Sequence, residues 1–294
     1  MAYRFKRREL VPEAARRIGD EQFAALVGHL QGETETGIHE ARKCCKMLRA
    51  LLRLVGPREA VAFDRADASL EKIARALAPV RDAEVRQRTF DAILIQAGPR
   101  AGSRFAQVRA VIETQAKNAR HLTLTAGDLR DIVAMATVAQ GKVNLLPMAH
   151  PGWRAIGPGL RKAYRHGRKA LAAAADDPSL ELRHRWRRHV KHLGFHVRLL
   201  HGAQPKKLGA LALQLETLSE TLGDEHDLGL LRRYLAVQGK RSRARAEFDS
   251  LASLIDRRRA GLRRSADKLG RRLFKAKPGE FVGRIEQAWR KWRR

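Results

Sequence analysis

The sequence predicts an all-α protein made of two related helical bundles, and three observations support this prediction. Residues 41–55, 59–77 and 208–222 place apolar residues three and four positions apart among strong helix formers. No stretch alternates apolar and polar residues between hairpin turns, so strands are not expected. Proline and glycine cluster at mid-chain, between Pro147 and Gly159, where we expect the boundary between two halves.

The two expected halves, residues 1–150 and 151–294, are related by a shift of 145 positions. Without a gap, this shift places His39 on His184, Arg42 on Arg187, Lys43 on Arg188, Lys46 on Lys191, Arg53 on Arg198, Leu70 on Leu215, and Arg16-Arg17 on Arg161-Lys162. One shift that matches residue types in separate segments indicates an internal duplication. We therefore expect two pseudo-symmetric bundles that face a basic groove or central pore.

The charge of the chain points to a polyanionic partner. Lys and Arg number 60 against 31 Asp and Glu, which gives a formal net charge of +29. A hydrophobic content of 44% is enough for a packed core and excludes wholesale disorder. Aromatic residues make up only 5%, which argues against a protein that reads single strands by base stacking.

The cysteines and the apolar runs indicate the expected environment. Cys44 and Cys45 are adjacent, so they can form neither a disulfide framework nor a zinc site with separated ligand pairs. They fit buried positions in a reducing compartment. No apolar run approaches the about 20 residues of a membrane span. We expect a cytoplasmic protein with no membrane contact.

Residues 38–55, drawn as a helix at about 100° per residue, carry two separate faces. The apolar face consists of Ile38, Ala41, Cys45, Leu48, Leu52 and Val55. The cationic face, called the first strip below, consists of His39, Arg42, Lys43, Lys46, Arg49 and Arg53. No acidic residue is expected within this strip.

The related segment near residues 183–200 preserves both faces. Its apolar face consists of Trp186, Val190, Leu193, Val197 and Leu200. Its cationic face, called the second strip, consists of His184, Arg187, Arg188, Lys191 and Arg198. The expected duplication has thus kept the charges as well as the core positions.

Two interpretations of the strips are open. A charged helix face is usually solvated, but such faces normally mix signs, because like charges four positions apart repel. Both copies keep these like charges despite their repulsion, and this favours an anion-binding site. His39 and His184 begin the strips, where neighbouring cations favour neutral imidazole that can bind phosphate or hold a neighbouring helix. The repeated cations Arg16, Arg17, Arg161 and Lys162 are further candidates for the site.

The residues of both strips resemble a known family. The run from His39 to Arg53 and its partner from His184 to Leu193 resemble the signature helices of the CHAD family, the conserved histidine α-helical domain. The opening at residues 3–5 and residues 78–85, 222–227 and 269–282 are similar to further family segments. The second copy departs from the family with Gly194-Phe195 in place of Arg-Tyr, so its strip is expected to be shorter.

The resemblance implies an all-helical domain of two pseudo-symmetric halves around a basic cavity that binds inorganic polyphosphate. Polyphosphate is a flexible polyanion without bases, and a track of Lys and Arg suits it. The expected function is non-catalytic polyphosphate binding, with recruitment to polyphosphate granules in the cytoplasm. The alternative is a general nucleic-acid-binding protein.

Neither an enzyme nor a cofactor is expected. The sequence has no glycine-rich phosphate loop with a Lys-Ser or Lys-Thr end, no G-x-S-x-G elbow and no H-E-x-x-H motif. His189, His192 and His196 crowd one segment, but metals avoid such cationic surroundings, so no metal site is expected. Asp82 and Asp227 each follow a predicted turn and are expected to act as acids at helix starts.

Overall fold

The structure is a computed structural model that describes residues 3–294 except 33–34, 57–59, 78, 121–124, 149 and 241. For residues 35, 60, 79–84, 115–120 and 126 it describes the backbone alone. The described residues form helices with no strand among them, which confirms the all-α prediction. The helices are α1 (Val11–Gln31), α2 (Glu35–Val55), α3 (Ala60–Ala76), α4 (Pro79–Ala97), α5 (Ala101–Arg104), α6 (Ala106–Arg120), α7 (Ala126–Asn144), α8 (Trp153–Asp176), α9 (Leu180–Leu199), η1 (His201–Ala203), α10 (Pro205–Gly239), α11 (Arg245–Leu273) and α12 (Pro278–Arg293).

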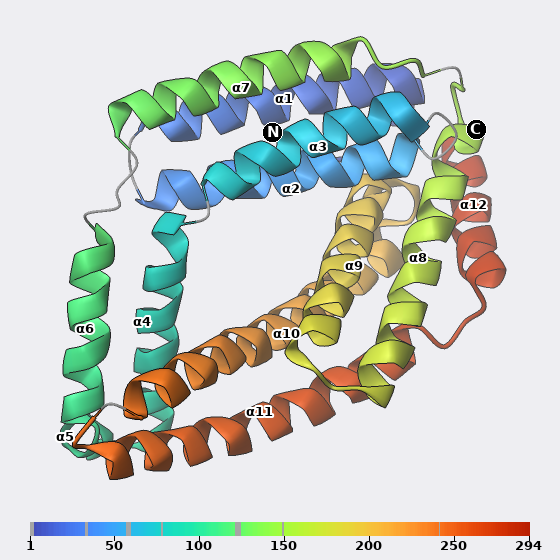
Figure 1. The fold of residues 1–294 in the computed structure, drawn as a ribbon. Helices are drawn as coiled ribbons and strands as arrows, with labels where there is room; N and C mark the ends of the chain where they lie inside the picture. Colours follow the sequence, from blue (N-terminus) through green and yellow to red (C-terminus); the bar gives the residue numbers. More distant parts are fainter. Residues whose placement is uncertain are drawn as a thin grey trace.

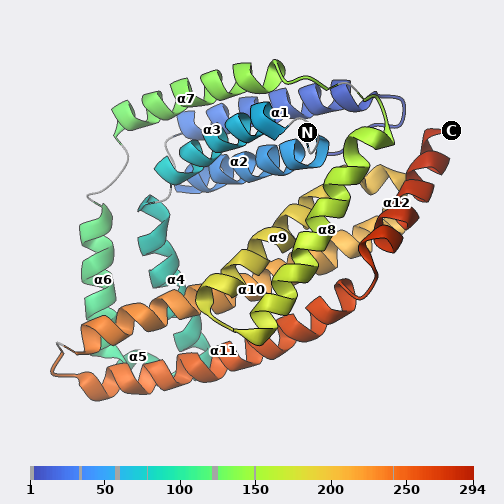
Figure 2. The ribbon, with the colours of Figure 1, turned by 45° about the vertical axis from the view of Figure 1, so that its right-hand side comes forward.

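The helices follow the outline of a four-sided frame (Figure 1). The bundle of α1, α2, α3 and α7 forms one side, and α8, α9 and α12 form the adjacent side. The long helices α10 and α11 form the opposite side, and α4 with α6 links their far ends to the first bundle (Figures 1 and 2). None of the described helices is both long and apolar enough to cross a lipid bilayer.

Three apolar cores hold this frame together. One core lies within the first bundle and contains Phe23, Leu48 and Leu70. A second joins α4 and α6 to α10 and α11, with Phe90 packed in the same cluster as Leu231. Burial of large apolar side chains is the main favourable contribution to folding, so the first cluster stabilises its bundle and the second holds α4 and α6 against α10 and α11.

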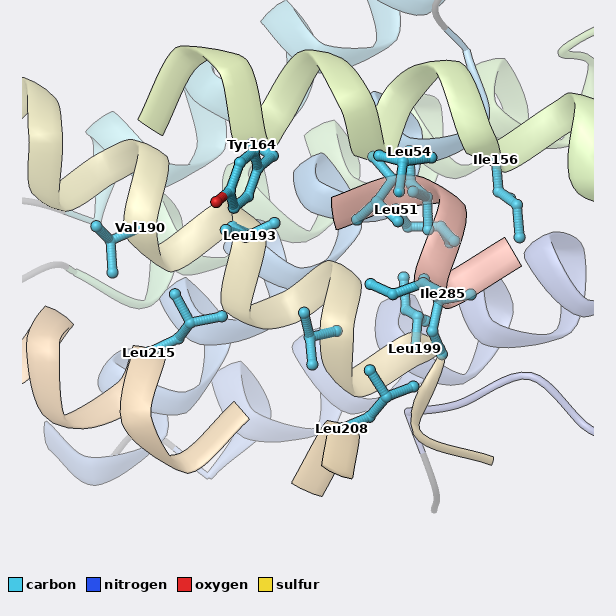
Figure 3. Packing of buried hydrophobic residues seen from close by; sticks show 14 of the residues in the cluster. Leu51, Leu54, Ile156, Tyr164, Val190, Leu193, Leu199, Leu208, Leu215 and Ile285 are labelled. Carbon is cyan, nitrogen blue, oxygen red and sulfur yellow. The ribbon is translucent and has the colours of Figure 1, made fainter. Parts of the chain in front are cut away.

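The largest core is shared between the two halves of the chain. Leu51 and Leu54 of α2 lie among side chains of α8 and α9, including Tyr164 and Leu193 (Figure 3). All four of these side chains are at most 1% exposed. The two halves are therefore packed into one another where α2 meets α8 and α9.

The helix bounds repeat at the shift found in the sequence. A shift of 145 residues moves α2 onto positions 180–200, which are α9 and one further residue. The same shift moves α3 and α4 onto 205–221 and 224–242, and both fall on the single helix α10 apart from its last few positions. These bounds agree with the duplication and with halves at 1–150 and 151–294, although both stay predictions.

The expected mid-chain boundary is shorter than its breaker residues suggest. Helix α7 ends at Asn144 and α8 begins at Trp153, so the connection covers residues 145–152. Gly157, Pro158 and Gly159 lie inside α8. Gly159 is needed there because α8 passes against the carbonyl end of α2. A Cβ atom at Gly159 would overlap the carbonyl oxygen of Leu54 and lie 2.7 Å from that of Arg53.

Replacing Gly159 with Ala is expected to lower the free energy of unfolding by about 1–3 kcal/mol, because backbone atoms cannot move aside as a flexible side chain can. Urea denaturation monitored by circular dichroism measures this change. Gly261→Ala in α11 is the matched control, since nothing lies within 4 Å of its added Cβ. The control should be neutral or stabilising, and equal losses in both variants would contradict the close crossing.

Candidate functional site

The two strips lie on helices whose apolar faces are buried as expected. In α2, Ala41, Cys45 and Leu48 are fully buried, while Lys43 is exposed. In α9, Trp186, Val190, Leu193 and Val197 are at most 1% exposed. The 3.6-residue period of the helix therefore places the strip cations away from the core.

Helices α2, α9 and α10 enclose a cavity of about 190 Å³, called the strip cavity. His39 and Lys43 of the first strip line it together with Lys191 and Arg198 of the second. Its remaining lining is Gly194, Phe195, Ala212, Leu215, Glu216, Ser219 and Glu220. The fold thus brings residues about 150 positions apart in sequence to one place.

Acidic side chains from other helices contact the strips. Arg49 donates to Asp67 of α3 at 2.9 Å, and Arg53 donates to the same carboxylate at 2.8 Å. Burial would raise the pKa of Asp67, but the hydrogen bonds from Arg49 and Arg53 outweigh it and hold this pKa below its ordinary value. The first strip itself contains no acid, but its C-terminal arginines have a counter-charge on α3 that the sequence analysis did not expect.

Two more strip residues have carboxylate partners. Lys43 Nζ lies 2.9 Å from Glu40, one helical turn earlier. Arg198 Nη2 donates to both carboxylate oxygens of Glu216 at 2.8 Å. These side chains are all substantially exposed, so solvent screens the pairs and they contribute little to stability. They leave Lys43 and Arg198 able to exchange a carboxylate for a phosphate.

The start of the second strip packs against α10. The ring centroids of His184 and His226 are 4.4 Å apart, and His226 Nδ1 lies 3.3 Å from Asp227. Burial, with the neighbouring His226 and arginines, lowers the pKa of His184 to about 4. Neutral imidazole is thus favoured, chiefly through desolvation. Arg187 lies over Gly223, where a Cβ atom would come within 2.7 Å of Nη2.

Asp227 does not begin a helix, because α10 runs without interruption from Pro205 to Gly239. Its expected role at a helix start was therefore wrong. The side chain of Asp82 lies outside the described residues. Cys44 and Cys45 are buried, as expected, and burial raises their thiol pKa to about 11 and about 12.

The repeated cations named above as further candidates for the site do not line the strip cavity. Arg17 donates to Glu9 at 2.6 Å and to Glu21 at 3.0 Å, which ties the opening segment to α1. Arg16 and Arg161 are exposed. Lys162 instead lines a second cavity with Arg53, described below as the histidine cavity. The histidines of the crowded segment, His189, His192 and His196, also line that cavity.

One buried ionic cluster was missed from the sequence. Glu225 of α10 is fully buried and accepts hydrogen bonds from Arg183, Arg259 and Arg263 at 3.3, 2.8 and 3.0 Å. Arg183 is 1% exposed and also donates to Asp267 at 3.0 Å. The cluster joins α9, α10 and α11 behind the second strip. Glu225 lies next to His226 in the segment that was expected to form a turn. An acidic residue in that segment was the signal from which the sequence analysis could have predicted the cluster.

The fold and the site define a class: all-helical proteins in which two basic helices from opposite halves meet around a cavity. The family model for the CHAD domain matches residues 17–236. The chain therefore belongs to the CHAD family, as the resemblance of its strips implied.

The fold is similar to the crystal structure of the CHAD domain from the plant Ricinus communis. The two structures superimpose with a TM-score of 0.64 over 94% of this chain and 95% of the plant chain. At 19% sequence identity, this likeness shows the shared fold. No curated protein sequence matched the chain.

Proposed function

We propose that this chain binds inorganic polyphosphate without transforming it, and that the strip cavity holds part of the phosphate chain. One observation carries the proposal: His39 and Lys43 meet Lys191 and Arg198 around a single cavity. Membership of the CHAD family supports the same ligand. A role in recruitment to cytoplasmic polyphosphate granules follows from such binding.

The chemistry of the strips suits a thin, flexible polyanion. A polyphosphate chain carries charge along its whole length and offers no base edges, so its recognition requires donors and positive potential alone. Arg forms forked hydrogen bonds to phosphate oxygens, while Lys acts as a mobile point charge. Glu216 and Glu220 line the α10 side of the strip cavity, so a polyanion is expected to pass along the side formed by the strip cations.

Reversing one charge in each strip tests the site. The double variant Lys43→Glu, Lys191→Glu is expected to weaken the binding of long polyphosphate by about a hundredfold, since each reversal costs about tenfold or more. Isothermal titration calorimetry measures the affinity. The matched control is Lys268→Glu, Lys275→Glu, which changes the net charge equally at exposed positions outside the cavity. Equal losses in both variants would show attraction to net charge alone.

Competition with nucleic acid tests the ligand. Long polyphosphate should displace duplex DNA from the protein near physiological salt, and DNA should not displace polyphosphate at matched charge. Affinity for polyphosphate should fall about 10³-fold or more between about 50 and 200 mM salt if six or more phosphates are contacted. Displacement of polyphosphate by DNA would instead support the nucleic-acid-binding alternative.

A further inference from the structure

The histidine cavity lies on the other side of α9 from the strip cavity and has a volume of about 220 Å³. It is enclosed by the C-terminal end of α2, by α3, by α8 and by α9. Its polar lining is Arg53, Asp64, Asp67, Lys162, His166, His189, His192 and His196. One water needs about 10–15 Å³ of such volume, so the cavity has room for a small polyatomic ion and its waters.

The hydrogen bonds fix the tautomers of two of the cavity histidines. Arg53 Nη1 lies 3.0 Å from His192 Nδ1, and because a guanidinium only donates, Nδ1 accepts and the ring proton is on Nε2. His196 Nε2 donates to the carbonyl oxygen of Ala50 at 2.8 Å. Its Nδ1 is buried, and no partner for it is found among the described residues. His196 is 1% exposed, so this atom is an unmet buried polar group.

The surroundings of the cavity are cationic on most sides. Helix α8 contributes Lys162, Arg165 and Lys169, and α9 contributes Arg185 and Arg188, which all lie close enough to lower the pKa of a cavity histidine. Of the acids, Asp67 is bound by both Arg49 and Arg53, and Asp64 is exposed. The pKa of His189 is lowered to about 4 by burial, by the neighbouring His166 and by Arg188, Arg53 and Arg185.

We propose that the histidine cavity is a separate site for one tetrahedral phosphate group, either inorganic phosphate or the end of a phosphate chain. Lys162 supplies the mobile charge, His189 and His192 supply neutral donors, and Arg53 supplies the fixed charge. The buried Nδ1 of His196, which lacks a partner among the described residues, takes up a proton when the anion enters. The site stands independently of chain binding in the strip cavity.

Proton uptake distinguishes this site from simple charge attraction. An anion beside a neutral imidazole favours the charged form of the ring and therefore raises its pKa. Binding near pH 6 should thus draw protons onto the cavity histidines. Sulfate is the useful probe for this measurement, because it is a tetrahedral dianion that does not itself titrate near neutral pH.

Replacement of Lys162 with Gln tests the site. It should weaken the affinity for inorganic phosphate by about fivefold or more, as expected when a charged donor is lost. Lys268→Gln on α11 is the matched control, because it removes the same charge from an exposed position that does not line the cavity. It should change the affinity by less than about twofold. Calorimetric titration with inorganic phosphate and with tripolyphosphate measures both variants.

The expected result is an equal fractional loss for both ligands in Lys162→Gln, which identifies a terminal phosphate as the recognised group. Loss for tripolyphosphate alone would contradict a single-phosphate site, as would equal behaviour of the two lysine variants. Titration of the wild type with sulfate in two buffers of different ionisation heat should show proton uptake, and His196→Gln should reduce it. Unchanged uptake would overturn the role of the histidines.

The strip variant separates this proposal from the function proposed above. Lys43→Glu, Lys191→Glu should lose long polyphosphate and retain wild-type affinity for inorganic phosphate. If the strip variant still binds long polyphosphate, the proposed function fails, whereas the proposal for the histidine cavity stands. If it loses inorganic phosphate as well, then one site binds both ligands and the separate cavity is wrong.

Discussion

Replacing Glu225 with Gln is expected to lower the free energy of unfolding by about 3–5 kcal/mol, because it leaves buried arginines without their counter-charge. Arg183 is 1% exposed and Glu225 is fully buried, so water cannot replace the lost partner. Asp267 offsets part of the charge of Arg183 at 3.0 Å, but Arg259 and Arg263 share the Glu225 carboxylate. Urea denaturation of the folded protein measures the change.

Glu216→Gln is the matched control for this prediction. Glu216 also lies on α10 and also accepts from an arginine, Arg198, at 2.8 Å, but both side chains are about 40% exposed. Its loss should cost less than about 1 kcal/mol, as is usual for exposed pairs. Similar losses in the free energy of unfolding for both variants would show that burial does not determine how much the Glu225 cluster stabilises the fold.

The Glu225 cluster also bears on the site. It lies on α10 beside His226 and Asp227, which contact or face the start of the second strip. Through Arg183 it fixes α9 against α10 and α11, and hence the register at which Arg187 passes over Gly223. Loss of Glu225 is therefore expected to weaken polyphosphate binding as well as stability, whereas loss of Glu216 should not weaken binding, since it removes an acid from the strip cavity.

The faces of α2 and α9 could be predicted from the sequence because a helix has a fixed period. Once Ala41, Leu48, Trp186 and Val190 are assigned to the core, the positions of the strip cations follow from the backbone alone. The shift of 145 residues predicted which cations correspond, and the helix bounds follow the same shift. The all-helical fold required only this local information.

Apart from Glu40, which lies one turn before Lys43 in α2, the acidic partners of the strip cations could not be predicted in this way, because they come from other helices. Asp67, which binds Arg49 and Arg53, lies on α3, and Glu216 lies on α10. A helical wheel of one segment holds no information about neighbouring segments. The expected turn at Gly223-Asp224 failed for a related reason, since Gly223 makes room for Arg187 instead of ending a helix.

Lowering the pH from 6.5 to 4 is expected to destabilise the fold through its buried histidines. His196 is 1% exposed, and burial is the largest cause that lowers its pKa from 6.5 to about 4, although its hydrogen bond to Ala50 opposes this. Above pH 6.5 the ring is neutral in both states and contributes no pH dependence. Between 6.5 and about 4 the unfolded chain binds a proton that the folded chain excludes, so the free energy of unfolding falls. For His196 the full difference corresponds to about 3 kcal/mol.

The effect should begin before the carboxylates titrate, because arginine partners hold the pKa of Glu9 and Asp67 below their ordinary values. Free energies of unfolding from urea denaturation at several pH values, in buffers without phosphate or sulfate, measure it. His196→Gln should lose stability at neutral pH but show a shallower decline toward pH 4, whereas His150→Gln, in the loop before α8, should keep the wild-type slope. Because the Nε2 of His196 already donates to Ala50 of α2, acid protonates its buried Nδ1, and the cost at this contact between α2 and α9 is that of burying a charge. Equal slopes of the free energy of unfolding against pH in all three proteins would show that the acid sensitivity comes from other groups and that pH does not affect that contact.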